Sequence, residues 1–324
     1  IALRWSWPLA LAMLLAAGSQ SFAQAPSKAA HIGYVYPGGG CRGTTFDVVV
    51  GGENMGPPDA RRGLDYEIVI QGKRIKDIAD IFISGGGIKA EVVSWYRPMT
   101  QGEAVRISIQ TMAKIEDVEK EQGRKITVKE AHKLLGITEE HLKEQEKYRQ
   151  READHKRQPN PQIGEELTVR VQIAPDAAVG ERELRFLTEA GMSNPLYFYV
   201  GQYPETSERE PNDVVPEPTV RVKLPMVING QIFPGDVDRF EFEAKKGTKL
   251  VARCDARGLI PYLADGVPGW FQAILHLYDD KGKEVAFADS LGFLHDPCLY
   301  YEVPKDGKYV IEVHDSIFRG REDF

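Results

Sequence analysis

The chain has 324 residues, long enough for two or three domains, and 42% of them are apolar, which is sufficient for real hydrophobic cores. Its formal net charge is −7 and its isoelectric point is near 5.6. This balance argues against nucleic acid as a partner, because phosphate binding requires a basic face, whereas an acidic exterior is compatible with cation binding.

The first 23 residues have the features of an export signal. Arg4 provides a positive charge, residues 5–17 form a short apolar stretch, and Ser21-Phe22-Ala23 has the small residues of a cleavage site. The apolar stretch is too short to cross a membrane, and no later segment approaches the roughly 20 apolar residues that a transmembrane helix needs. We therefore predict a signal peptide over 1–23 and export to the periplasm, the cell surface or the extracellular space, with a buried N-terminal helix as the alternative.

Residues 31–200 contain short segments of alternating polarity that end at glycine-rich turns, a pattern typical of a β-sandwich. The predicted strands are 31–36, 44–50, 66–70, 81–83, 88–96, 105–109, 167–173, 184–187 and 196–200. Between them, residues 114–160 are rich in charges of both signs. Thr127 and Glu130 form a capping box, and Thr138 caps a second segment. We predict helices over 128–135 and 139–152, in an insertion that packs loosely on the sandwich.

Residues 201–218 form an acidic, proline-rich stretch, which indicates a linker. Beyond it, predicted strands recur at 239–244, 250–256, 274–278, 284–288, 299–303 and 309–313. The predicted fold class is therefore all-β, with β-sandwich modules at 31–200 and 219–324 and a charged helical insertion in the first.

Few residues lie in patterns typical of a catalytic or metal-binding site. None of the seven histidines lies in a His-Glu-x-x-His motif, and no serine lies in a Gly-x-Ser-x-Gly elbow, so we predict no catalytic residues and no enzymatic activity. We interpret His314-Asp315 as an ordinary pair at a strand end. Export would permit a disulfide between Cys254 and Cys298, but the alternation argues against it, and the spacing of the cysteines fits no zinc site.

Gly43-Thr44-Thr45-Phe46 leads into Gly51-Gly52-Glu53-Asn54-Met55, and residues 178–186 and 191–200 close the same region. These segments resemble the opening strand, the Gly-x-Asn-apolar turn and the closing strands of the TIG (IPT-like) branch of immunoglobulin folds. The resemblance implies an immunoglobulin-like sandwich for the first module.

Four segments carry a second resemblance: Glu208-x-Glu210-Pro211-Asn212-Asp213, then residues 235–242, 277–285 and 304–313. They resemble the bacterial pre-peptidase C-terminal (PPC) domain, a jelly-roll-like β-sandwich that accompanies secreted peptidases and other exported proteins. Together the two resemblances suggest a large exported protein of the planctomycete type. Such domains bind or position other molecules.

The opening motif of the PPC-like region is also a candidate calcium site. Glu208, Glu210, Asn212 and Asp213 place four oxygen-bearing side chains within six residues, and calcium takes six to eight oxygen ligands. In calcium-binding PPC domains this motif works with aspartates of the next conserved turn, which the resemblance assigns to Asp236 and Asp238. Ca²⁺ is thus the one cofactor that we expect, and a solvated acidic linker is the alternative.

We predict a non-catalytic exported binding or structural protein that meets a protein or glycan at the cell surface. The alternative is the non-catalytic N-terminal part of a larger secreted peptidase or other exported enzyme, and the residues leave both open. Position 1 is Ile rather than Met, and Phe324 lies where the PPC-like region should begin its closing strand. We therefore expect a fragment, with an open sheet edge beside 309–313.

Overall fold

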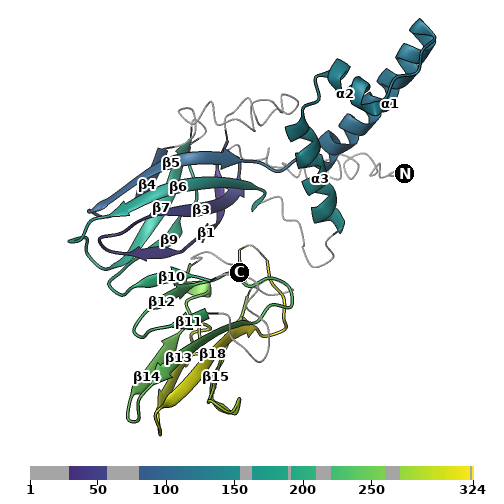
Figure 1. Ribbon diagram of the computed structural model, residues 1–324. Helices are drawn as coiled ribbons and strands as arrows, with labels where there is room; N and C mark the ends of the chain where they lie inside the picture. Colours follow the sequence, from purple (N-terminus) through teal and green to yellow (C-terminus); the bar gives the residue numbers. More distant parts are fainter. Residues whose placement is uncertain are drawn as a thin grey trace, which may run out of the picture.

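The computed structural model describes residues 29–56, 80–153, 163–188, 191–208, 220–259, 271–321 and 323–324. This part of the chain is mostly β, with several sheets and a group of helices that projects to one side of them (Figure 1). The predicted signal peptide, the predicted strand 66–70 and three of the predicted calcium ligands, Glu210, Asn212 and Asp213, lie outside the described residues.

The described residues of the N-terminal part form two sheets. The first has the order β1-β3-β6-β5, formed by His31–Tyr36, Thr45–Glu53, Glu165–Ile173 and Ile88–Tyr96. The second has the order β2-β9-β7-β4, formed by Gly39–Cys41, Leu196–Gly201, Gly180–Thr188 and Asp80–Ile83, with β8 (Gly191–Met192) paired to β7. Buried side chains of both sheets form a single apolar cluster, so the two sheets pack face to face as in a β-sandwich.

Strand β6 shows why the sequence pattern was informative here. Leu167, Val169, Val171 and Ile173 are all buried, while the residues between them are more exposed. Successive side chains of a strand point to opposite faces, so this alternation places one apolar face against the core. The predicted strands at 31–36, 81–83, 88–96 and 167–173 are confirmed to within a residue or two.

Three helices, α1 (Gln101–Gln122), α2 (Val128–Leu135) and α3 (Glu139–Ala153), lie between β5 and β6 in the described chain. The predicted helices over 128–135 and 139–152 are confirmed. The predicted strand at 105–109 is wrong, because these residues lie inside α1, which begins well before Lys114. None of these described helices is both long and apolar enough to cross a membrane.

A capping box at the start of α1 explains why residues 105–109 are helical and do not form the predicted strand. The hydroxyl of Thr100 accepts a hydrogen bond from the backbone of Glu103, whose carboxylate accepts one from the backbone of Thr100. Five residues of alternating polarity are too few to distinguish a strand from a helix. The burial of Ala104, Thr111 and Val118, at a seven-residue spacing, follows the helical period instead.

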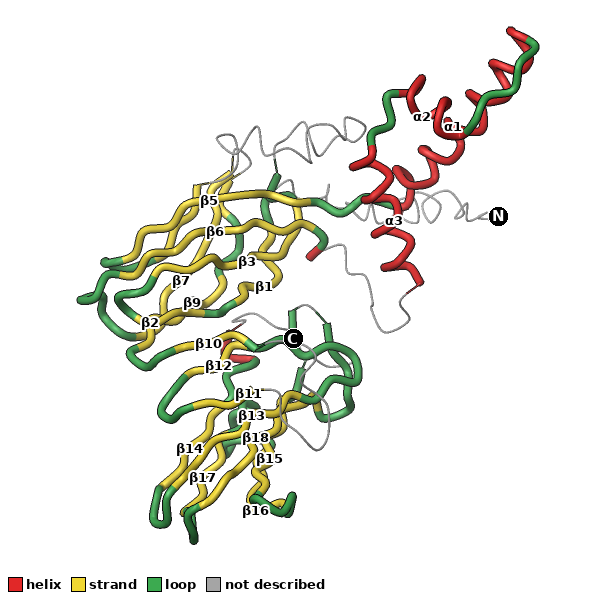
Figure 2. Tube along the Cα trace, viewed as in Figure 1, coloured by secondary structure: helices red, strands yellow, loops and turns green. Residues whose placement is uncertain are grey.

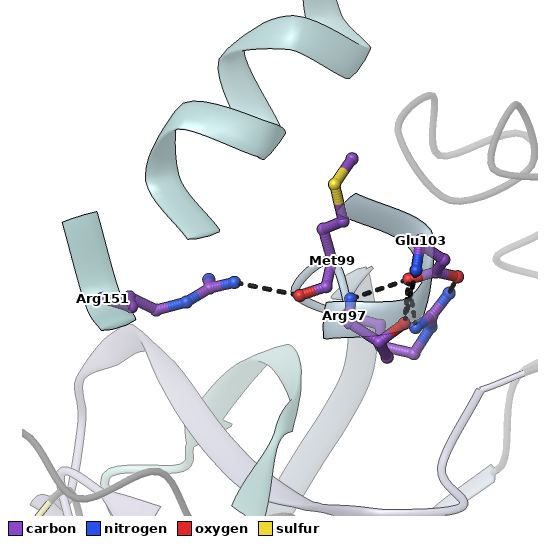
Figure 3. A network of polar contacts seen from close by, with 5 residues as sticks. Arg97, Met99, Glu103 and Arg151 are labelled. Carbon is purple, nitrogen blue, oxygen red and sulfur yellow. Dashed lines mark hydrogen bonds and ion pairs between the residues drawn. The ribbon is translucent and has the colours of Figure 1, made fainter. Parts of the chain in front are cut away.

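A polar network anchors both ends of the helical segment near the end of β5 (Figure 3). Arg97 makes an ion pair with Glu103 at 2.6 Å, and Arg151 of α3 donates to the carbonyl oxygen of Met99 at 3.3 Å. Burial alone would raise the pKa of Glu103, but hydrogen bonds from Arg97 and Thr100 outweigh it and lower that pKa. These bonds join α1 and α3 to the residues that directly follow β5. They do not test the prediction that the insertion packs loosely on the sandwich.

In the C-terminal part, the described residues form a five-stranded sheet and two two-stranded sheets (Figure 2). The larger sheet has the order β11-β13-β18-β15-β16, formed by Val220–Val222, Asp238–Ala244, Gly307–Asp315, Ala273–Tyr278 and Glu284–Ala288. Strands β14 (Lys249–Arg253) and β17 (Cys298–Glu302) pair with each other, as do β10 (Glu205–Ser207) and β12 (Val227–Asn229). Phe240, Leu277, Leu299 and Tyr309 belong to a cluster of buried residues separate from that of the first sheets.

The predicted open edge beside 309–313 is wrong. Strand β18 lies inside its sheet, because β13 pairs with one side of it and β15 with the other. Phe324 lies in no strand. Its carbonyl oxygen accepts a hydrogen bond from the backbone of Ile232, and its ring stacks on Phe271.

The cysteines Cys41, Cys254 and Cys298 are free thiols. Cys298 lies opposite Arg253 in the β14–β17 ladder, and the backbone N–H of Cys254 donates to Pro297. The two sulfur-bearing residues are thus one position out of register, which places their side chains on opposite faces. Burial raises the pKa of Cys254 to about 12, so this thiol stays protonated and unreactive.

Candidate functional site

Of the residues predicted to bind calcium, Glu208, Asp236 and Asp238 are described. Glu208 accepts a hydrogen bond from the backbone N–H of Gln231 at 2.5 Å, and Asp236 accepts one from Phe233 at 3.1 Å. Glu208 and Asp236 therefore lie at one loop, 231–237, although 28 positions separate them in the sequence. Asp238 is buried at the first position of β13, where it faces Val313.

A different polar cluster lies on the outer face of the five-stranded sheet. His276 of β15 is directly opposite Glu312 of β18, and His314 follows two positions later on the same face. Their neighbours Leu275, Leu277 and Val313 point the other way and pack in the core. Strand alternation and cross-strand register together bring the three polar side chains to one place. We call His276, Glu312 and His314 the histidine–glutamate cluster.

The cluster is compact and largely enclosed. The Nε2 atoms of His276 and His314 are 3.2 Å apart, and one ligand atom from each member lies within 4.8 Å of the others. Glu312 and His314 are each 7% exposed. In the part of the chain that the structure describes, this is the one group of three or more histidine, cysteine or acidic side chains placed to hold a metal ion. Glu208, Asp236 and Asp238 therefore do not form such a group by themselves, and the predicted calcium site depends on Glu210, Asn212 and Asp213 as well.

Each member of the cluster is held by a further hydrogen bond. Nδ1 of His276 is 2.8 Å from the carboxylate of Glu284, and Nδ1 of His314 is 2.8 Å from the carbonyl oxygen of Asp315. Arg239 of β13 donates to Glu312 at 2.7 Å. The rings are fixed as well, since Phe318 stacks on His314 with centroids 4.7 Å apart.

Tyr278 lies beside the histidine–glutamate cluster on the same face of the sheet. Its hydroxyl is 3.4 Å from the carboxylate of Glu312, and its ring stacks on His276. Burial, and then the negative charges of Glu312 and Glu284, raise the pKa of Tyr278. The hydroxyl therefore keeps its proton and serves as a donor to the cluster.

The sequence interpretation missed this cluster. His276 and His314 are 38 residues apart, and no local motif joins them. His314-Asp315 was expected to be an ordinary strand-end pair, and this holds for Asp315, whose carboxylate accepts backbone hydrogen bonds from Gln272, Ile317 and Arg319. One feature of the sequence could have indicated the cluster: His276 and His314 both occupy polar positions in strands where polar and apolar residues alternate.

A shallow hollow of about 210 Å³ lies elsewhere, where β2 and β3 meet β10 and β12. Cys41, Phe46, Asp47, Glu205 and Asn229 are among its lining residues. Burial raises the pKa of Glu205, which Asn229 partly offsets through a hydrogen bond. Both carboxylates of the hollow are engaged, since Asn229 donates to Glu205 and Arg170 makes an ion pair with Asp47.

Comparison with known proteins adds no family to this description. No protein-family model matches the chain, and no curated protein matches it. The resemblances to TIG and PPC domains therefore stay predictions from the motifs.

Proposed function

We propose that this chain is a non-catalytic exported protein that acts by contacting another protein at the cell surface. In this proposal a TIG-like sandwich carries the helical insertion, and a PPC-like sandwich follows it. The sheet-rich architecture is compatible with this assignment. The observation that carries the proposal is an exposed apolar stripe on the projecting helix α1.

The stripe consists of Val105, Ile109 and Met112, whose exposed fractions are 48, 63 and 59%. Residues spaced by four and three positions lie on the same side of a helix. A different side of α1 is occupied, because Gln145 of α3 donates to the carbonyl of Ala104, and Val118 packs with Ala131 of α2. Helix α1 thus uses one face to hold the helical segment together and presents a second apolar face to solvent.

The spacing of the apolar side chains in the stripe indicates which class of molecule would bind there. Apolar side chains at i, i+4 and i+7 are the anchors that an amphipathic helix inserts into a hydrophobic groove. A glycan would instead require aromatic platforms or polar side chains. Helix α1 extends away from the sheets (Figure 1), and the exposure of the stripe leaves it open to a partner. We therefore propose a protein with an apolar groove as the partner.

Binding to cells of the encoding species tests this proposal. We expect the labelled full chain to bind their surface saturably, and Ile109→Glu to weaken binding at least about tenfold, since one buried anchor contributes more than 1 kcal/mol. The matched control is Gln110→Glu, which adds the same charge at an exposed position outside the stripe. Equal binding by both variants would contradict the proposal, and competition by purified surface glycans would assign the contact to a glycan.

We further propose that Glu208, Glu210, Asn212, Asp213, Asp236 and Asp238 bind Ca²⁺ and stabilise the PPC-like module. The position of Glu208 and Asp236 at one loop supports this assignment.

The expected result is a rise in melting temperature when chelator is replaced by millimolar calcium. Ligand at a hundredfold excess over its dissociation constant adds about 2.7 kcal/mol to the free energy of unfolding. Glu210→Gln should reduce the rise, because it removes one charged ligand, and magnesium should not replace calcium. A melting temperature that is the same in chelator and in calcium refutes the site.

A further inference from the structure

We infer that the histidine–glutamate cluster is a binding site for a divalent transition metal ion of the zinc type. The ligands are His276 and His314 through Nε2 and Glu312 through its carboxylate. This site is separate from the proposed calcium site and does not depend on the surface-binding function.

The tautomers of both histidines follow from their outer hydrogen bonds. Nδ1 of His314 is 2.8 Å from a backbone carbonyl oxygen, which only accepts hydrogen bonds, so Nδ1 carries the proton. Nδ1 of His276 is 2.8 Å from the carboxylate of Glu284, and the same reasoning applies. In its neutral form each ring therefore has its free lone pair on Nε2. Metal-ligating histidines in proteins are held in this way, with the second ring nitrogen donating to a carboxylate or a carbonyl.

The two lone pairs face each other across a short gap. The Nε2 atoms of His276 and His314 are 3.2 Å apart, and two lone pairs at that distance repel unless a proton or a metal ion lies between them. A tetrahedral zinc ion with Zn–N bonds of about 2.05 Å separates its nitrogen ligands by about 3.3 Å. The observed separation is thus close to one edge of a zinc coordination tetrahedron.

Glu312 supplies the third ligand. It lies opposite His276 and two positions before His314 on the same face. Its Oε2 is held by Arg239 at 2.7 Å, whereas the contact between its Oε1 and Tyr278 is long, at 3.4 Å. Oε1 is therefore the atom that can turn toward the ion. The ligand atoms lie within 4.8 Å of one another, so a small rotation of this carboxyl group completes three ligands and leaves a fourth position for water.

The types of ligand atom in the cluster indicate which metal ion it would bind. Two imidazole nitrogens and one carboxylate suit zinc and its neighbours among the transition metals, whereas calcium and magnesium take oxygen ligands. Glu284, Asp315 and Arg239 form the outer shell that orients the three ligands. The cluster has both the chemistry and the support of a built metal site.

Metal titration of the full chain tests the inference. After treatment with chelator and dialysis, we expect the chain to bind one Zn²⁺ at this cluster, measured by competition with a chromophoric chelator. We also expect Co²⁺ to give the intense visible absorption bands of a tetrahedral site. His276→Ala and His314→Ala should each weaken Zn²⁺ binding about a hundredfold or more. The matched control is His295→Ala, at an exposed position, which should leave the affinity unchanged.

Two further variants distinguish a loss of metal binding from a loss of the folded structure. Glu284→Gln leaves all three ligands in place and should weaken Zn²⁺ binding about 10- to 100-fold, as loss of an outer-shell partner does. His276→Gln preserves size at a partly exposed position, and its unfolding in chelator should match that of the unaltered chain. Zn²⁺ binding that survives in both His276→Ala and His314→Ala would overturn the inference. So would the absence of Zn²⁺ binding with a proton shared between the two rings, visible by nitrogen-15 NMR.

Discussion

Replacing Glu165 by alanine is expected to destabilise the N-terminal sheets by about 3–4 kcal/mol. The carboxylate of Glu165 accepts hydrogen bonds from the backbone N–H groups of Asn54, Met55 and Gly56 and from the indole of Trp95, at 2.9–3.1 Å. A hydrogen bond to a charged group contributes about 1.5–3 kcal/mol, and donors left without an acceptor add their own cost, although such terms are not additive.

These contacts hold the turn that follows β3. Asn54 has a left-handed backbone (φ 57°), and Met55 is completely buried. The carboxylate of Glu165 therefore fixes a strained turn and seats an apolar side chain in the core. Urea unfolding followed by circular dichroism measures the loss. Glu165→Gln should retain part of the stability, because the amide oxygen still accepts.

The matched control is Glu91→Ala. Glu91 is an exposed carboxylate on the neighbouring strand β5, and its removal should change the free energy of unfolding by less than about 0.5 kcal/mol. Equal stability of Glu91→Ala and Glu165→Ala would show that the four hydrogen bonds do not hold the turn.

Truncating Tyr309 to alanine is expected to cost about 3–5 kcal/mol in the C-terminal part of the chain, the range found for large aromatic side chains in cores. Tyr309 is 1% exposed, and its ring packs on Phe242 with centroids 6.1 Å apart. The matched variant Tyr309→Phe keeps the ring and loses only the hydrogen bond to the carbonyl of Lys305, a loss of about 1 kcal/mol.

Comparing Tyr309→Ala with Glu165→Ala also tests the predicted division into modules 31–200 and 219–324. If each part unfolds by itself, Tyr309→Ala should move one transition and Glu165→Ala the other. Contacts do join the parts, since Tyr36 donates to the carbonyl of Asn229 and Leu259 lies against Gly38. A single transition that both variants move by the same amount would instead show one cooperative unit.

Local patterns were sufficient where the signal repeats over enough residues. The alternation of Leu167 to Ile173 predicted strand β6, and the capping box at Thr127 and Glu130 predicted the start of α2, because both depend only on neighbouring residues. Residues 105–109 show the limit of such patterns, because five residues of alternating polarity lie inside a helix that begins at the capping box of Thr100 and Glu103.

The sequence by itself determined helices α2 and α3 and strand β6 with its apolar face, because these properties follow from backbone geometry and the period of the side chains. Only the tertiary structure decided that β18 lies between β13 and β15. The same register places His276 beside Glu312 and His314 across 38 residues of chain. Register between distant strands depends on how the whole core packs, so no local pattern contains it.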